Sequence, residues 1–318
     1  MSATPDYRID ASDDNVHQTW DNDHDPVRTV EPGAVVEFDC RDATDGYLDE
    51  DSTVADVVEM VDVGGGHPLT GPVAVEGARP DDTLAVDLLD LEHEGIGYSY
   101  FYPGAEEWGL LSEEFPDAGL HVWDLDGAVG RFANGIEVPL DPFPGNLGVA
   151  PGEDGSHSTT PPRRVGGNLD VKHLTAGSTL YLPVEVAGAL FSVGDCHGAQ
   201  GDGEVCVTGI EAPMTVTARL RLGSDRSVDR PTFETTGPYS AHGAGEPAYG
   251  TTGISDDLMD ATKEAVGAMI DHLRENRELT GAEAYLLCSA IVDLKINEVV
   301  DKPNWVVSAY LPQRIFPE

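Results

Sequence analysis

The stretch Met214-Thr215-Val216-Thr217-Ala218-Arg219-Leu220-Arg221-Leu222 decides the fold class of this chain. Every second side chain in it is apolar, which is the pattern of a β-strand with one buried face. Three further segments, residues 35–38, 84–88 and 180–186, each follow a turn and are predicted strands of the same kind. The 36 glycines and 22 prolines supply the turns that such strands need. The sequence therefore predicts a mainly β protein with an antiparallel sandwich or barrel core.

The C-terminal third of the sequence has a different pattern. Apolar residues at helical spacing predict a helix over residues 256–275 with Ser255 as its cap. Thr280-Gly281-Ala282-Glu283 reads as a capping box that opens a second helix over residues 282–293. Trp305–Pro312 is predicted to be a closing strand. This part is thus expected to be a smaller α/β region.

The chain has 318 residues, enough for one large or two ordinary domains. We predict a β-sandwich or barrel region over residues 1–225 that carries most of the site. Residues 226–318 are then a connection and the C-terminal α/β region packed on it. The connection, residues 226–250, is rich in Pro, Gly, Thr and Ser and is expected to be a long linker or a lid.

The net charge of −40 comes from 58 acidic and 18 basic residues, and the acidic residues are spread along the whole chain. Such a surface repels itself at low salt, whereas 1 M salt screens charges beyond about 3 Å. The charge therefore predicts adaptation to a saline cytoplasm. A cation-storage or chaperone-type acidic protein would instead gather its charge in runs, and only residues 10–25 approach one. Nucleic acid is excluded as a partner because phosphates require basic patches.

Neither a membrane nor a disulfide scaffold is expected. No apolar run approaches the roughly 18–20 residues of a membrane helix, and the N-terminal residues lack the pattern of a signal peptide. The 4 cysteines include no Cys-x-x-Cys pair. We therefore expect a soluble cytoplasmic protein.

The richest candidate site is the stretch of residues 192–204, which follows an apolar strand and is expected to form a glycine-rich loop. It contains Asp195, His197 and Glu204, and carboxylate and imidazole groups suit zinc or a similar divalent ion. The alternative is a polar β-turn with only structural roles. His67, which lies between Gly64-Gly65-Gly66 and Pro68, has a rigid setting that favours a site role as well.

Two more polar clusters offer partners for this stretch. One contains His17 and Trp20, and the other contains Asn168 and Asp170 after Gly166-Gly167. The sequence has no Gly-x-Ser-x-Gly elbow, no Walker lysine motif and no His-Glu-x-x-His helix. Residue types alone therefore point to a mostly β protein that is a candidate mononuclear metal hydrolase.

An ordered set of motifs resembles the acetamidase/formamidase family over residues 16–312. The motifs are His17-x-x-Trp20-Asp21, His67-Pro68-Leu69-Thr70-Gly71-Pro72, Gly148-Val149-Ala150-Pro151, Gly166-Gly167-Asn168-Leu169-Asp170, residues 192–204, Ala284-Tyr285-Leu286-Leu287-Cys288-Ser289 and Pro303-Asn304-Trp305-Val306-Val307-Ser308. The resemblance implies a mostly β fold, hydrolysis of short-chain amides such as formamide and acetamide to ammonia and carboxylate, a divalent metal such as zinc, and homo-oligomers. Cys196 stands where relatives often carry Gly, which argues against an obligatory role for its thiol.

The resemblance also implies roles for individual residues. His67, Asp195 and His197 would hold the metal, which polarises the amide carbonyl and acidifies water. Glu204 would be the base that takes a proton from water and passes it to the departing amine.

Four residues would act around this centre. Asp170 and Asn168 would orient ligands or hold the substrate amide, and His17 with Trp20 would close a small pocket. Three other functions remain open on the sequence alone: a metal-containing β-sandwich protein that binds small amides without turnover, a hydrolase of another C–N bond, and a structural acidic protein.

Overall fold

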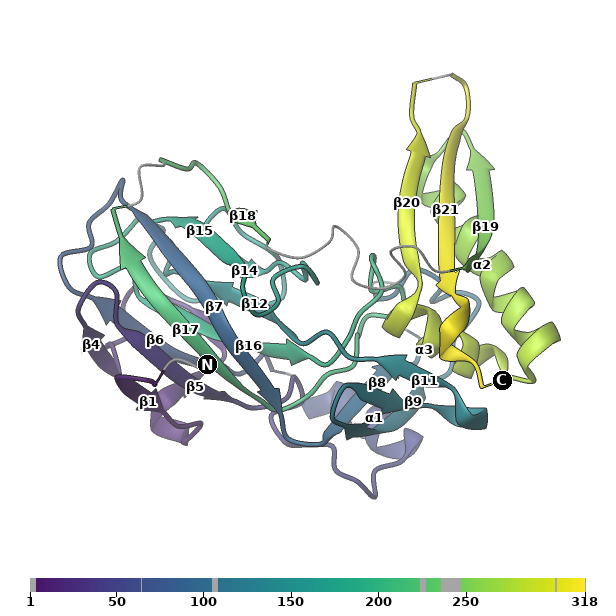
Figure 1. Cartoon of the computed structure of the whole chain (residues 1–318), viewed down its shortest axis with the longest axis horizontal. Helices are drawn as coiled ribbons and strands as arrows, with labels where there is room; N and C mark the ends of the chain where they lie inside the picture. Colours follow the sequence, from purple (N-terminus) through teal and green to yellow (C-terminus); the bar gives the residue numbers. More distant parts are fainter. Residues whose placement is uncertain are drawn as a thin grey trace.

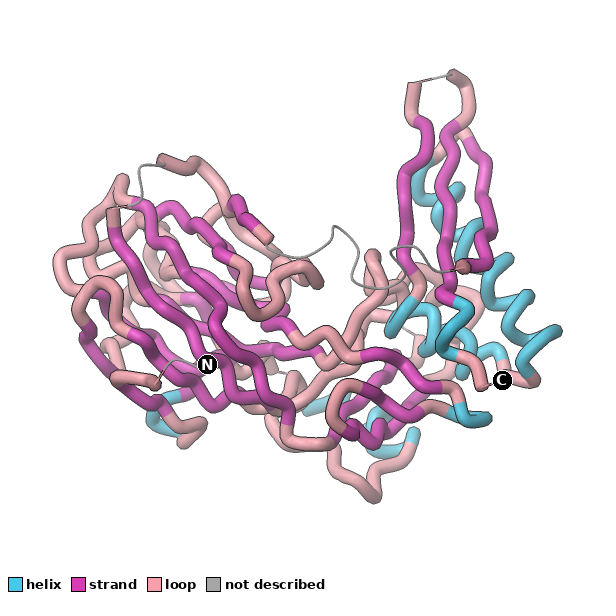
Figure 2. Tube along the Cα trace, viewed as in Figure 1, coloured by secondary structure: helices cyan, strands magenta, loops and turns pink. Residues whose placement is uncertain are grey.

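The computed structural model describes residues 4–317 except 64, 105–107, 224–226, 236–246 and 301. The described chain is mostly β, with several antiparallel sheets and few helices, which confirms the predicted fold class (Figures 1 and 2).

The strand that decided the fold class lies in the middle of a six-stranded sheet. The order of this sheet is β1 (Tyr7–Ile9), β5 (Val35–Cys40), β17 (Met214–Leu222), β7 (Thr83–His93), β15 (Thr179–Pro183) and β18 (Thr232–Glu234). Its pairs are antiparallel except for β1 with β5. In β17, Val216, Ala218 and Leu220 are fully buried. On its other face Arg221 forms two hydrogen bonds to Asp87, so the alternation in sequence marks the two faces of the sheet.

A second sheet packs against the first and forms a sandwich (Figure 1). Its order is β14 (Gly166–Asn168), β12 (Phe143–Gly148), β16 (Phe191–His197), β6 (Leu69–Val75) and β2 (Val16–His17), and β4 (Arg28–Val30) also pairs with β6. Phe38 of one sheet meets Phe191 of the other with ring centroids 5.8 Å apart. Every residue of β16 and of β6 is buried, so these two strands lie inside the molecule.

Smaller elements complete the body of the molecule. They are a four-stranded sheet of β11 (Glu137–Pro139), β10 (Val129–Arg131), β9 (Gly119–Asp126) and β8 (Ile96–Phe101), the pair β13 (His157–Ser158) and β3 (Thr19–Trp20), helix α1 (Val54–Val63), and the 3-10 turns η1 (Asp13–Asn15), η2 (Ala133–Gly135) and η3 (Gln313–Ile315). Helix α3 (Gly281–Ile291) packs on β8 and β9.

The C-terminal strands form an arm beside this body (Figure 1). The arm is a three-stranded sheet in the order β19 (Ala248–Ser255), β21 (Trp305–Pro312) and β20 (Asp293–Glu298), and helix α2 (Leu258–Arg277) packs on β19 and β21. The packing is close at Gly253, where a Cβ would lie 1.9 Å from the carbonyl oxygen of Ala261.

The helices and the strand predicted for the C-terminal part are mostly confirmed. Thr280 and Glu283 form the predicted capping box of α3, and β21 has the predicted bounds. The predicted cap of α2 is wrong. Asp257, not Ser255, accepts the hydrogen bonds from the first helical N–H groups, because Ser255 still belongs to β19. Helix α3 also ends at Ile291, since Asp293 begins β20.

Two further predictions concern boundaries. The strand expected over residues 180–186 ends at Pro183, which has no N–H to continue the ladder. A domain boundary after residue 225 stays a prediction, and β18, which lies beyond it, pairs with β15 of the body. Residues 236–246 of the predicted connection lie outside the described residues. Within the described part of the chain, no helix has the length and apolarity to cross a bilayer.

Candidate active site

Strand β16 carries two of the predicted ligands into the interior. Asp195 and His197 lie at its end, where His197 is opposite Phe143 of β12 on one side and Glu211 on the other, and they are 4% and 1% exposed. The expected loop over residues 192–204 is therefore wrong in its first half, because Phe191, Val193 and Cys196 are fully buried and their segment pairs as a strand. Asp195 has a left-handed backbone (φ 52°), a conformation that is concentrated at functional sites in non-glycine residues.

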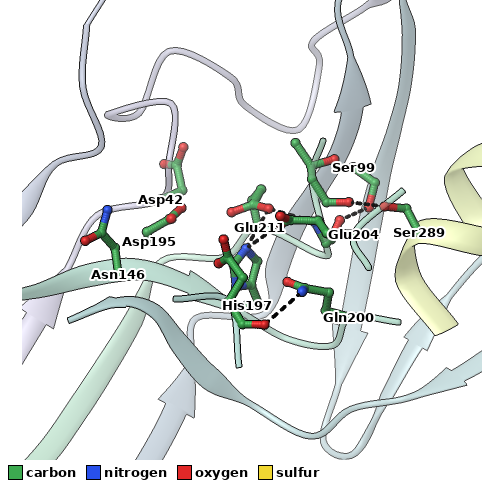
Figure 3. Close-up of polar contacts among 12 residues, drawn as sticks. Asp42, Ser99, Asn146, Asp195, His197, Gln200, Glu204, Glu211 and Ser289 are labelled. Atoms are coloured by element: carbon green, nitrogen blue, oxygen red, sulfur yellow. Dashed lines mark hydrogen bonds and ion pairs between the residues drawn. The ribbon is translucent and has the colours of Figure 1, made fainter. Parts of the chain in front are cut away.

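His197 lies between two carboxylates (Figure 3). Its Nε2 is 2.9 Å from Oε1 of Glu211 and 3.4 Å from Oε1 of Glu204. Glu211 is 2% exposed and its Oε1 also accepts a hydrogen bond from the backbone N–H of Gly209. In the neutral form of the ring, a proton on Nε2 satisfies this carboxylate and the lone pair of the imidazole lies on Nδ1. Nδ1 is buried and has no hydrogen-bond partner among the described residues.

A second group of ligand atoms shares His197. Asp170, Asp195 and His197 each offer one atom within 4.8 Å of the others. The chain makes this convergence possible at Gly145 of β12, where a Cβ would lie 2.5 Å from both Oδ1 of Asp170 and Cε1 of His197. Any side chain at this position would occupy the space in which the ligand atoms meet.

His67 lies at the edge of this group, next to Asp195. Its Nδ1 is 3.7 Å from Oδ2 of Asp195 and 3.1 Å from Nδ2 of Asn146, and its side chain is 25% exposed. The loop is held by a hydrogen bond from the backbone N–H of His67 to Oγ1 of Thr159. At Gly66 a Cβ would lie 2.3 Å from the carbonyl oxygen of Gln18, so the glycine before His67 allows close packing.

Burial shifts the pKa values of the whole cluster. It raises the pKa of Glu204 and of Glu211 to about 7, and it raises the pKa of Asp170 well above its usual range, with the charge of Glu204 adding to the effect. Burial alone would lower the pKa of His197, but the negative charges of Glu211 and Asp195 and the hydrogen bonds to Glu204 and Glu211 together outweigh it and raise that pKa well above its usual range. The site therefore concentrates negative charge that protons or a cation must neutralise.

The buried atoms without partners fit a divalent cation. Oδ1 of Asp170 and Nδ1 of His197 are fully buried, and neither has a hydrogen-bond partner in the part of the chain that the structure describes. Carboxylate oxygen and imidazole nitrogen are the donors that zinc and similar ions take in catalytic sites. A cation among Asp170, Asp195 and His197 would satisfy atoms that are otherwise costly to bury.

A family model, the Acetamidase/Formamidase family, matches this chain over residues 4–158 and 153–318. The chain belongs to this family. The acetamidase of Mycolicibacterium smegmatis is 30% identical, and the match covers 85% of this chain and 84% of the relative. The formamidase of Methylophilus methylotrophus is 27% identical and the match covers 96% and 90% of the two chains. The solved structure of the gamma lactamase from Delftia acidovorans superposes with a TM-score of 0.88 at 29% identity, covering 97% of this chain and 91% of that one.

In this acetamidase/formamidase member, the fold brings together five of the eight predicted site residues. His67, Asp170, Asp195, His197 and Glu204 are linked by the contacts described above. Of the others, His17 uses both ring nitrogens in hydrogen bonds, with the carbonyl of Thr19 and Oγ of Ser192, each at 2.8 Å. Burial lowers the pKa of His17 to about 4, so the ring is neutral at physiological pH.

Asn168 is the last residue of β14, and Trp20, the last residue of β3, packs against this strand at Gly167. Trp20 is 2% exposed, and a Cβ on Gly167, next to Asn168, would lie 3.5 Å from its indole Nε1. Nε1 of Trp20 and Oδ1 of Asn168 are both buried without a hydrogen-bond partner among the described residues.

Sequence reasoning missed Glu211 and Asn146. Glu211 stands between Ile210 and Ala212 just before β17, and a charged residue in a buried apolar setting was the available signal. Asn146 is fully buried in β12, and its neighbours Gly145 and Leu147 gave no sign of a site.

Proposed function

We propose that this protein hydrolyses short-chain aliphatic amides, such as formamide and acetamide, to carboxylate and ammonia with the help of a bound divalent metal, zinc being the first candidate. The amidohydrolase class follows from family membership. The metal dependence is supported mainly by one observation, the group of Asp170, Asp195 and His197, each of which offers one ligand atom within 4.8 Å of the others.

We assign His67, Asp195 and His197 as the residues that would hold the metal, with Asp170 in the same group. An amide needs such help because resonance makes its carbonyl a weak electrophile and its nitrogen a poor leaving group. A divalent metal, when bound, polarises a carbonyl and lowers the pKa of water.

Glu204 is the proposed base and proton shuttle. Its pKa of about 7 allows its carboxylate to accept the proton of the attacking water and to donate it to the departing nitrogen near neutral pH. Glu211 holds the imidazole of His197 through Nε2, which keeps Nδ1 available as a ligand atom. Asp170 is the second proposed catalytic carboxylate, and its closeness to His197 allows it to orient the ring.

The substrate would be held on the side of Trp20 and Asn168. The indole N–H of Trp20 can donate to an amide carbonyl, and Oδ1 of Asn168 can accept from an amide N–H. His17 would hold Trp20 and its neighbours in place rather than donate to the substrate, since both of its ring nitrogens already form hydrogen bonds within the protein.

The test is ammonia release from formamide and acetamide in about 2–4 M KCl, a range chosen from the charge-screening argument, with and without a chelator. The same preparation is analysed for metal. Turnover that is lost on chelation and restored by zinc would support the proposal. A folded, metal-loaded protein that releases no ammonia would instead favour a non-catalytic protein that binds small amides.

A second candidate reaction is the ring opening of a γ-lactam, which is hydrolysis of another C–N bond. The TM-score of 0.88 with the gamma lactamase from Delftia acidovorans favours it. Assay of 2-pyrrolidinone separates the two reactions, because ring opening gives an amino acid and no ammonia.

The cellular setting follows from the charge. We propose that the enzyme works in a cytoplasm of high salt, where the −40 charge is screened. From its membership of the family, we also propose that it forms homo-oligomers. Sedimentation in about 2–4 M KCl tests the second statement.

A further inference from the structure

Two amide oxygens near the site have no hydrogen-bond partner in the described part of the chain. Oδ1 of Asn146 and Oδ1 of Asn168 are buried, and no described residue donates a hydrogen bond to either. Asn146 is 0% exposed. A buried acceptor without a donor is costly, so in native structures its partner usually lies outside the polypeptide, as an ordered water, an ion or a ligand.

The strand register places these two side chains together. Asn146 of β12 and Asn168 of β14 are directly opposite each other in an antiparallel pair. Opposite residues in such a pair share a face of the sheet, with Cβ atoms about 4.5–5.5 Å apart. The two oxygens therefore belong to one small area of the sheet.

The orientation of the Asn146 amide is fixed by its surroundings. Its Nδ2 lies 3.1 Å from the backbone carbonyl oxygen of Thr159 and 3.1 Å from Nδ1 of His67. A backbone carbonyl only accepts hydrogen bonds, so the nitrogen must face Thr159 and the oxygen must face away from it. The same contact with His67 ties Asn146 to the proposed metal ligands, since Nδ1 of His67 is 3.7 Å from Oδ2 of Asp195.

We propose that Asn146 is a specificity-determining residue whose Oδ1, together with Oδ1 of Asn168, accepts the two hydrogens of an unsubstituted amide nitrogen. This inference rests on the proposed amidase function. A primary amide offers two N–H groups and satisfies both oxygens. An N-alkyl amide or a lactam offers one N–H group, so one acceptor stays unpaired. A carboxylate product offers none, so both acceptors stay unpaired.

The experiment compares kcat/KM for acetamide and N-methylacetamide, with ammonia and methylamine measured as products of the metal-loaded full chain. Wild type is expected to prefer acetamide by about 10–100-fold, the effect of one unpaired buried acceptor. Asn146→Leu keeps the size of the side chain and removes the acceptor, so it should reduce this preference at least about 10-fold by lowering the rate on acetamide.

Gln200→Met is the matched control. Gln200 is also a buried amide with an unpartnered oxygen, but its Nε2 donates to the backbone carbonyl of Asp170, and it lies on the other side of His197 from Asn146 (Figure 3). Its replacement should leave the ratio within about twofold of wild type whatever happens to the rate, because a loss of packing affects both substrates alike. Asn168→Leu should reduce the preference for acetamide as Asn146→Leu does. It replaces Asn146→Leu in the experiment if that variant does not fold.

The outcomes separate this inference from the proposed function. If folded, metal-loaded wild type hydrolyses no amide, the proposed function itself is wrong. Active wild type that shows no preference for acetamide, or a preference that both Asn variants keep, would overturn the role of Asn146 alone. A loss of preference in Gln200→Met but not in the Asn variants would also overturn it.

Discussion

Nε2 of His197 lies 2.9 Å from Oε1 of Glu211, and the two side chains are 1% and 2% exposed. This buried pair occupies Nε2, whereas Nδ1 is buried and has no hydrogen-bond partner among the described residues, so it remains available as a ligand atom. Glu211 therefore connects the segment just before β17 to the proposed metal ligands on β16.

Replacement of Glu211 should weaken metal binding more than it weakens folding. In Glu211→Gln the imidazole loses its charged acceptor, and outer contacts of this kind typically contribute 10–100-fold to metal affinity. We expect an apparent zinc affinity lower by about that factor, measured by competition with a chromophoric chelator. Excess zinc should restore part of the ammonia release. Glu185→Gln, which removes a surface carboxylate paired with Arg164, is the control and should bind zinc as wild type does.

Replacement of Glu204 should affect turnover and leave the metal in place. Glu204→Gln keeps the shape of the side chain but cannot accept a proton, so kcat should fall by about 100-fold or more. Metal content per chain should match wild type, because Glu204 is not among the proposed ligands. Retained metal together with a rate within tenfold of wild type would remove Glu204 from the role of base.

Replacement of Gly145 should damage the site selectively. In Gly145→Ala the new Cβ would lie 2.5 Å from Oδ1 of Asp170 and from Cε1 of His197, so these ligands must move apart. We expect loss of both zinc binding and ammonia release. Gly267→Ala, in helix α2, meets no atom within 4 Å and should keep activity and raise stability by about 0.5–1 kcal/mol. Full activity in Gly145→Ala would show that the ligands do not converge at that point.

The stability of the metal-free protein should fall as the pH rises from about 4.5 to 7. The folded-state pKa values of Glu204 and Glu211 are about 7, above the unfolded value of about 4.3. Between these values the folded state binds more protons than the unfolded state, so the free energy of unfolding decreases with pH. His197, whose folded-state pKa is also raised, acts in the same direction.

Thermal unfolding at fixed high salt, with chelator or with saturating zinc, measures this effect. Zinc should flatten the decrease in Tm, since a cation takes the place of the protons. The double variant Glu204→Gln/Glu211→Gln should show a weaker pH dependence than wild type even with chelator. An unchanged pH dependence in the double variant would assign the effect to other groups.

Stability should also rise with salt because of the net charge of −40. From about 0.1 M to about 1 M the Debye length falls from roughly 10 Å to 3 Å, which screens repulsion between the acidic side chains. Tm should increase over this range with KCl and with NaCl alike. An uncharged osmolyte at matched osmolality is the control, and an equal increase with it would argue against screening.

The sequence predicted those features that depend on neighbours in the chain. The alternation in Met214–Leu222 identified a strand with one buried face, and Thr280 with Glu283 identified the start of α3. It failed at Ser255, because a serine next to a helix caps it only when no preceding strand holds that residue. The motifs also identified the family and five residues that meet in the site.

The identity of the candidate site residues was thus largely present in the sequence, whereas their arrangement was decided by the tertiary structure. Sheet register opposes Asn146 to Asn168, and the close packing at Gly145 brings Asp170 to His197. Burial then raises the pKa of Glu204 and Glu211, which no local pattern encodes. The physical reason is that proximity and desolvation depend on which distant segments pair, and hydrophobic periodicity specifies the face of a strand but not its partner.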